Sequence, residues 1–360
     1  MKVLKLEEFR ELVDCVAEEI RQDYEKIEEN YHWPERKLAH QKKCSKSTKK
    51  QDKTPKNHFK NFQKTVGFKE TFDLRMQTPK LWEALNQQDA TSRIKITETE
   101  YFQLIPNPST KKAYSNEKSI HYPKLLSDPK VWFARLIIAK WGGVGSNDYD
   151  KLEDYVEQLT DLHKMIIEGN IDLYDSSLYE PFGNGVSSWS KLLSFSLPKY
   201  FVIYDTRVAY RLDSIIAKYL NSRLSFLKNS PFYLDRYRVS GSDGKKPLTE
   251  ELNSQFIGGL KGTSVSNSYA IYLRLVDELT KKFKDSISLN EDAVRVKHKI
   301  EMTLFTTGRI ADQELNSQYF KELNDPTNIN FKVWEKKNSN NPCKTGYESL
   351  VQRLLKDLNR

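Results

Sequence analysis

The stretch from Gly183 to Leu212 is the feature that most limits how this chain can fold. A Gly-Asn-Gly turn opens it, a short apolar helix over 187–196 follows, and a proline ends that helix. An extended apolar run over 200–204 then leads to Asp205, at the start of the next helix. The pattern therefore predicts a carboxylate at a helix N-terminus, opposite a glycine turn.

The rest of the chain is predicted to be mainly helical. The segment 131–141 is apolar almost all round, which indicates a buried helix, and Ser127-Asp128-Pro129 before it is a helix-start signal. Alternating residues from Arg93 predict a short strand, and a little more β is expected near residue 330. Apolar residues at helical spacing predict helices over 4–30, 131–141, 149–168, 187–196, 206–222, 266–285, 290–307 and 347–358.

Positive charge is concentrated in one segment. Between Arg36 and Lys69 there are 12 basic residues and one acid, Asp52, hence a net charge of +11. The whole chain carries +9, so the remainder sums to −2. A concentrated basic segment is typical of a protein that binds a polyanion, and the alternative is a solvated loop.

Composition divides the chain into five parts. The helical part between 127 and 310 contains the organising stretch and a loop-like insertion at 223–265 that is rich in glycine and serine. The expected parts are an N-terminal amphipathic helix (1–35), a basic arm or loop (36–69), a mixed region (70–126), the helical domain (127–310) and a C-terminal extension (311–360).

Several classes of protein are excluded by the sequence. No run of about 18 apolar residues is present, so we expect no membrane span, and the N-terminus lacks a signal-peptide core. Three cysteines far apart suit a reducing cytoplasm. His40, Cys44 and His58 do not have a zinc-site spacing. We expect a cytoplasmic monomer that uses neither a metal ion nor a cofactor.

The glycine turn is a candidate phosphate site. Glycines allow a sharp backbone turn that points N–H groups outward at the start of a helix, and small residues after it permit close approach of a nucleic-acid backbone. The alternative is an ordinary turn between helices. The candidate DNA-binding residues of the turn are Gly183, Asn184, Gly185, Val186, Ser187 and Ser188.

Asp205 is the candidate catalytic carboxylate. A carboxylate that follows a buried run is unfavourable unless the helix N-terminus or hydrogen bonds stabilise it. A helix N-cap is the alternative role, and the two roles are compatible. Val208 stands where a capping box would need Glu or Gln.

This stretch resembles the helix-hairpin-helix DNA glycosylase superfamily. The resemblance lies in the order of its parts: the glycine turn, the helix, the apolar run and the Asp-Thr-Arg-Val helix start. That family combines a Gly-hydrophobic-Gly hairpin with an aspartate about twenty residues later, and 20 residues separate Gly185 from Asp205 here. Asn184 departs from the hydrophobic middle position. The segments Ser-Lys-Leu-Leu-Ser-Phe and Tyr-Asp-Thr-Arg-Val are similar to segments of bacterial 8-oxoguanine-DNA-glycosylase-like (OGG-fold) proteins. The segment from Glu301 resembles their C-terminal helix, so the likeness covers roughly 125–310.

The resemblance implies base excision. A modified nucleotide would be flipped out of the duplex, and Asp205 would stabilise the positive charge on the sugar and orient the nucleophile. Bifunctional relatives carry a lysine where Ser187 stands here. Lys191 lies one helical turn later, so either Asp205 activates water or Lys191 forms a Schiff base. A phosphate contact is a third role for Lys191.

Further site residues follow from the same resemblance. Asn147, in the loop between two predicted helices, would fill the gap that a flipped base leaves, unless that loop is a plain turn. Trp141, Trp189 and Tyr204 would line a base pocket, with core packing as the alternative for the tryptophans. Arg207 stands where the family usually has histidine and suits a phosphate.

The expected partner is double-stranded DNA with a modified base. The resemblance implies a DNA glycosylase of base-excision repair, or of antiviral defence against hypermodified phage DNA such as DNA with glucosylated hydroxymethylcytosine. The basic segment would add salt-sensitive affinity. The alternative is a non-catalytic helix-hairpin-helix DNA-binding protein. A metal-dependent nuclease would need clustered acidic ligands, and the sequence offers no convincing set.

Overall fold

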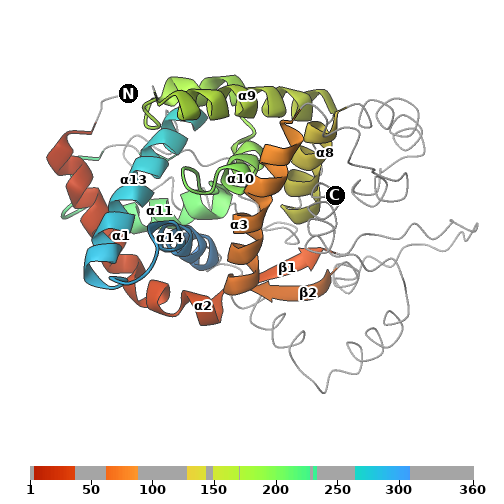
Figure 1. Cartoon of the computed structure of the whole chain (residues 1–360). Coiled ribbons are helices and arrows are strands. Elements are labelled where there is room, and N and C mark those ends of the chain that lie inside the picture. The colour runs from red at the N-terminus through yellow and green to blue at the C-terminus, as the bar shows by residue number, and fades with distance from the viewer. Residues whose placement is uncertain are drawn as a thin grey trace, which may run out of the picture.

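The computed structural model describes residues 4–36, 62–87, 128–142, 149–169, 171–227, 230–232 and 264–308. Within these ranges the chain is mainly helical, as predicted, with one two-stranded sheet (Figure 1). The α-helices are α1 (Leu6–Glu25), α2 (Ile27–Asn30), α3 (Phe68–Leu85), α8 (Pro129–Arg135), α9 (Tyr149–Glu168), α10 (Val186–Ser196), α11 (Thr206–Tyr219), α13 (Val265–Ser286) and α14 (Ala293–Thr307). The predicted strand from Arg93, the β near 330 and the helix over 347–358 lie outside the described residues.

The helix boundaries follow the local sequence signals. The Asp128 carboxylate accepts from the amides of Lys130 and Val131, which confirms the helix start predicted there. The predicted helix over 131–141 is present but changes hydrogen-bond pattern halfway. It continues as a π-helix, η3 (Leu136–Trp141), and the Gly142 amide donates to the Ile137 carbonyl at 2.8 Å. Such π-helical turns are rare in proteins, and those that occur are often found at functional sites.

A hairpin brackets the predicted basic arm. Strand β1 (His32–Arg36) pairs antiparallel with β2 (Phe62–Gly67), and α3 follows β2 directly. The arm or loop predicted over 36–69 was therefore wrong at its C-terminal end, where β2 and the first residues of α3 lie. Charged residues and Pro34 hide the alternation that marks a strand, and residues 37–61 lie outside the described part of the chain.

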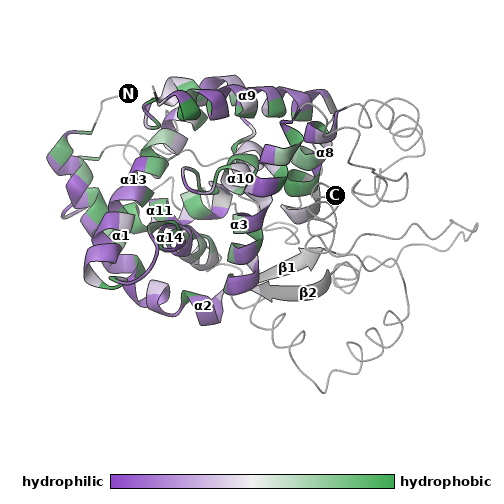
Figure 2. Cartoon of the chain, in the orientation of Figure 1, coloured by the Kyte–Doolittle hydropathy of each residue, from purple (hydrophilic) through white to green (hydrophobic). Residues whose placement is uncertain are grey.

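Helix α14 forms the centre of the molecule. It runs between α1, α11 and α13 (Figure 1), and every one of its residues from Val296 to Phe305 is buried. The surrounding helices turn apolar faces inward and polar faces outward (Figure 2). Buried side chains of α1 and α3 belong to this same hydrophobic core, so the core crosses the domain boundary predicted at residue 126.

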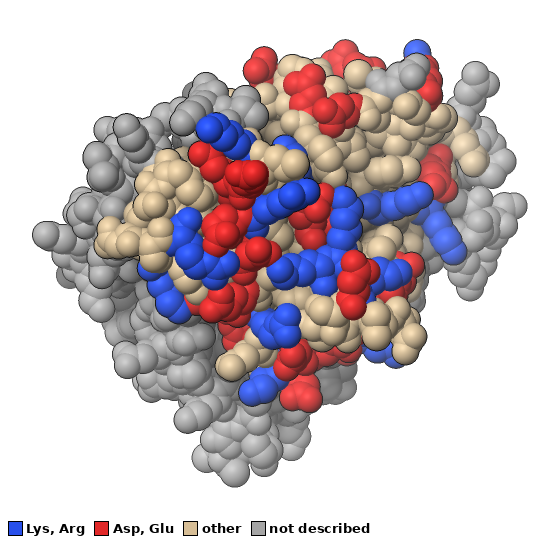
Figure 3. All heavy atoms as spheres, turned by 90° about the vertical axis from the view of Figure 1, so that its left-hand side faces the viewer, with Lys and Arg blue, Asp and Glu red and all other residues tan. Residues whose placement is uncertain are grey.

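Charges of both signs are interleaved on the face that α1 and α13 share (Figure 3). Arg223 bonds Glu18 at 2.8 Å and also contacts Glu11, and Lys282 bonds Asp14 at 2.5 Å. Mixed signs cancel over short distances, so this face is not a basic surface for a polyanion. None of the helices in the described ranges is long and apolar enough to cross a membrane.

Candidate active site

The segment 197–205 brings Asp205 back alongside α10. The Ser190 hydroxyl, in the second turn of α10, accepts from the Tyr204 amide at 3.1 Å and donates to the Tyr204 carbonyl at 3.0 Å. Both backbone groups of one residue are thus held by one side chain. Asp205 is therefore held beside the middle of α10, and its charge acts on Lys191, whose Nζ bonds Ser187 in the first turn of that helix.

Side chains satisfy the other carbonyls of this irregular segment. His298 Nε2 donates to the Pro198 carbonyl at 3.0 Å, and the Tyr269 hydroxyl donates to the Val202 carbonyl at 3.0 Å. Lys297 Nζ lies 3.2 Å from the Lys199 carbonyl oxygen. Because buried backbone groups need partners, these bonds fix a segment that forms no regular helix or strand. The fixed segment in turn fixes the position of Asp205.

Asp205 is the N-cap of α11, as one of the two interpretations predicted. Its Oδ1 accepts from the amides of Arg207 at 2.9 Å and Val208 at 3.2 Å. Within the described part of the chain, Oδ2 has no hydrogen-bond partner, and the residue is partly exposed. One oxygen thus holds the carboxylate in place and the other is open to a ligand or a water molecule.

Lys191 is buried, with 2 % of its surface exposed. Its Nζ donates to the carbonyl oxygen of Ser187 at 2.5 Å and to the Ser187 hydroxyl at 2.8 Å. Burial lowers the pKa of Lys191 to about 8, with the Asp205 carboxylate opposing this effect and the Arg207 charge adding to it. The charges of these three side chains therefore act on one another at one place in the fold.

The pKa of Lys191 predicts a pH dependence of stability. Because it lies below the ordinary value of 10.5, the unfolded chain binds more protons between about pH 8 and pH 10.5, and stability rises with pH across that window. Replacing Lys191 with Met should remove this rise, which amounts to about 3 kcal/mol at most. Urea unfolding of both proteins through this window measures it. The same slope in Lys191→Met would contradict the assignment.

The glycine turn is exposed and precedes an open helix end. Gly183 has φ +65°, a conformation that favours glycine, and the N-cap Gly185 supplies no side chain to bond the first amides of α10. The Trp189 indole donates to the Gly183 carbonyl at 3.2 Å and so ties the turn to the buried core. The 3₁₀-helix η4 (Ser176–Phe182), rather than an α-helix, leads into the turn.

Gly185 is required because α9 approaches its backbone closely. A Cβ at this position would lie 2.0 Å from the Tyr155 hydroxyl oxygen and 3.2 Å from its Cζ. Gly185→Ala should lower the free energy of unfolding by about 1–3 kcal/mol. In a Tyr155→Phe background the loss should be smaller, because the nearest atom is gone. An equal loss in both backgrounds, measured by thermal unfolding, would show that contact with the hydroxyl is not the cause.

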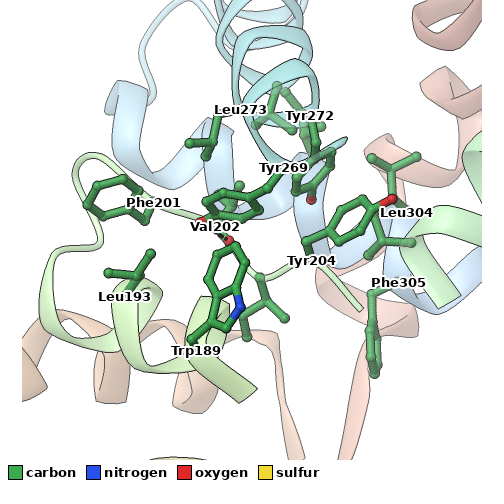
Figure 4. Close-up of a cluster of buried hydrophobic side chains, with 14 of the residues drawn as sticks. Trp189, Leu193, Phe201, Val202, Tyr204, Tyr269, Tyr272, Leu273, Leu304 and Phe305 are labelled. Atoms are coloured by element: carbon green, nitrogen blue, oxygen red, sulfur yellow. Dashed lines mark hydrogen bonds between the residues drawn. The ribbon is translucent and has the colours of Figure 1, made fainter. Parts of the chain in front are cut away.

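The predicted base-pocket aromatics lie in the core. Trp189 has no exposed surface and packs against Tyr269, with ring centroids 4.7 Å apart (Figure 4). Tyr204 is 1 % exposed. Trp141 is 6 % exposed and packs against Phe195 at 4.5 Å. Stacking on a base needs an open ring face, so the prediction for these three residues is corrected to core packing.

Of the two remaining predicted site residues, Arg207 lies within the described part of the chain and Asn147 does not. The Arg207 guanidinium lies over the Phe305 ring at 4.7 Å, and its Nη1 is buried without a hydrogen-bond partner among the described residues. Arg207 thus stands beside Asp205 with spare donors. Asn147, the candidate for the gap left by a flipped base, lies outside the described residues.

A buried charge cluster next to Lys191 was not predicted. Arg75 of α3 bonds Glu301 of α14 through both terminal guanidinium nitrogens, Nη2 to Oε1 at 3.0 Å, and both side chains are at most 2 % exposed. With its proton on Nε2, His298 offers Nδ1 as the acceptor for Arg75 Nη1 at 2.8 Å. Burial alone would raise the pKa of Glu301, but the charge of Arg75 and its hydrogen bonds hold that pKa below its usual value.

The cluster also reaches the aromatic residues beside η3. The Arg75 guanidinium lies 5.7 Å from the centre of the Trp141 ring and 5.3 Å from that of Phe195. Gly142, at the end of η3, borders the stem of Lys191, because a Cβ there would lie 2.5 Å from Lys191 Cδ. Helices α3, α10, α14 and η3 therefore meet around the buried amine.

Metal ligands are not clustered in the described residues: no group of three or more His, Cys, Asp or Glu side chains there could hold a metal ion. Comparison of the chain with protein-family models, with curated proteins and with solved structures found no match in any of the three.

Proposed function

We propose that this chain is a DNA N-glycosylase that flips a modified base out of the duplex and hydrolyses its N-glycosidic bond. The observation that carries the proposal is the return of Asp205 to α10, the helix that follows the glycine turn, through the two Ser190 bonds to Tyr204. Helix α10 thus has an exposed glycine turn with open amides at its start and a fixed carboxylate alongside it. The first can hold backbone phosphate, and the second can act on the sugar.

The chemistry follows from the open oxygen of Asp205. Oδ2 takes a proton from a water molecule, whose oxygen bonds to C1′ as the bond from C1′ to the base nitrogen breaks. The base leaves with the bonding electron pair and takes up a proton from solvent, and Asp205 gives the proton that it took back to solvent. The negative charge of Asp205 also stabilises the positive charge on the sugar in the transition state. The products are the free base and an abasic site.

Hydrolysis is favoured over a Schiff-base reaction. The Lys191 amine is buried and donates to both oxygens of Ser187, so it is not free to attack a sugar carbon. We therefore propose a monofunctional glycosylase of the helix-hairpin-helix kind, in which Lys191 and Arg207 add positive charge beside Asp205. Borohydride trapping of a covalent protein–DNA complex, with Lys191→Ala as the control, tests this choice.

The test of the function is the formation of abasic sites. The protein is incubated with phage DNA that carries glucosylated hydroxymethylcytosine, with duplexes that carry defined oxidised or alkylated bases, and with unmodified duplex. We expect abasic sites on a modified DNA and none on the unmodified duplex. DNA binding without abasic sites on any of these substrates would instead support a non-catalytic DNA-binding protein.

A further inference from the structure

Lys297 of α14 is buried, and its ammonium group has three acceptors within hydrogen-bond distance. Its Nζ lies 2.6 Å from Asp277 Oδ1, 3.2 Å from the Lys199 carbonyl oxygen and 3.3 Å from the Tyr200 carbonyl oxygen. A lysine has three N–H donors, so one carboxylate and two backbone carbonyls use all of them. The Tyr174 hydroxyl donates to Asp277 Oδ2 at 2.9 Å and so fixes the carboxylate that holds the amine.

The two carbonyls that Lys297 binds belong to a turn at the start of the segment that leads to Asp205. The amides of Tyr200 and Phe201 both donate to the Leu197 carbonyl, at 3.0 and 3.1 Å. This turn is therefore compact, and the ammonium group holds it against α14 through two successive carbonyls. A charged donor makes such bonds stronger than a neutral donor does.

The chain between this turn and Asp205 is buried throughout. Residues 201–204 are each at most 3 % exposed, and they belong to the hydrophobic cluster that α10 and α13 share (Figure 4). Close-packed interiors transmit a displacement instead of absorbing it. The run is held at both ends, by Lys297 at the turn and by Ser190 next to Asp205. A shift of the turn therefore passes along the buried run toward Asp205.

We propose that Lys297 is a positioning residue that sets the place of Asp205 through the backbone of residues 199–204. This inference rests on the proposed glycosylase function and names a residue that neither the sequence patterns nor the family resemblance indicated. In this role Lys297 contacts neither DNA nor the sugar. Its loss displaces the carboxylate, and a displacement of about 1 Å can lower the rate of a reaction about 100-fold.

The experiment compares Lys297→Met and Lys297→Arg with the matched variant Lys299→Met. Lys299 lies on the same helix, is buried to a similar extent and pairs with Glu291 and Glu28. For Lys297→Met we expect kcat for excision to fall about 10–100-fold, with KM and DNA binding unchanged, because the glycine turn keeps its place. Lys297→Arg keeps a cation with several donors and should recover most of kcat. Lys299→Met should lose thermal stability and keep kcat.

Hydrogen exchange gives a second measurement, which does not depend on excision. The Tyr204 amide donates to the Ser190 hydroxyl and reports on the end of the run next to Asp205. Relative to the other core amides, it should exchange faster in Lys297→Met than in wild-type protein, because a loosened segment opens locally. In Lys299→Met this relative rate should stay as in wild type. An unchanged relative rate in Lys297→Met would show that the run does not depend on Lys297.

Three results of the excision assay would also overturn the inference. If wild-type protein excises a base and Lys297→Met has the same kcat, Lys297 does not position Asp205. If both Lys297→Arg and Lys299→Met lose as much kcat as Lys297→Met, the loss follows from lower stability. If wild-type protein forms no abasic sites on any substrate, the proposed function fails and the inference fails with it, so the wild-type assay tells the two failures apart.

Discussion

Replacing Asp205 with Asn should reduce the rate of base excision by about 10²–10⁴-fold and leave DNA binding unchanged. An amide can neither take a proton from water nor oppose the positive charge on the sugar. Asn is as good an N-cap as Asp, so the bonds to the amides of Arg207 and Val208 are retained and α11 keeps its start. The expected loss is therefore one of chemistry and not of folding.

The measurement is a single-turnover assay of abasic sites, with DNA binding measured by fluorescence anisotropy. Asp292→Asn is the matched control, because Asp292 caps α14 in the same way, through a bond from the Val294 amide at 2.8 Å. That variant should excise at the wild-type rate. Unchanged excision by Asp205→Asn would remove Asp205 from the mechanism and with it the proposed function.

The largest expected effect on stability comes from the ion pair between α3 and α14. Arg75→Met leaves the Glu301 carboxylate buried without its cation, and should lower the free energy of unfolding by about 3–5 kcal/mol. The double variant Arg75→Met/Glu301→Leu should recover much of this loss, because neither charge then remains in the core.

Urea unfolding of the three proteins measures these differences. Lys281→Met is the control: this lysine pairs with Glu278 at 2.7 Å on the surface, where such a pair contributes less than about 1 kcal/mol. If Arg75→Met costs no more than Lys281→Met, the buried pair does not hold α3 against α14.

Local sequence signals account for most of the helices. The apolar spacing of α9 and α13 and the Asp-Pro start of α8 determine where these helices begin and end, because periodicity and capping act over a few residues. The role of Asp205 as a cap could be foreseen for the same reason. Helix α3 could not, because Pro79 lies inside it and a proline normally marks a helix end.

Contacts between distant parts of the chain could not be foreseen. Arg75 and Glu301 are 226 residues apart, and nothing local to either marks it as buried. The misplacement of Trp189 has the same origin, since an aromatic residue at a helix start suits either a pocket or a core.

The end of α14 has a consequence for engineering this protein. Gly308 closes the helix against the backbone of Arg207, where a Cβ would lie 2.2 Å from the carbonyl oxygen. Helix α14 therefore ends against Arg207, which is two residues after Asp205, the residue with the open carboxylate oxygen. A bulky tag inserted at Gly308 should disturb the site, whereas a small environment-sensitive dye attached nearby would report on whatever enters it.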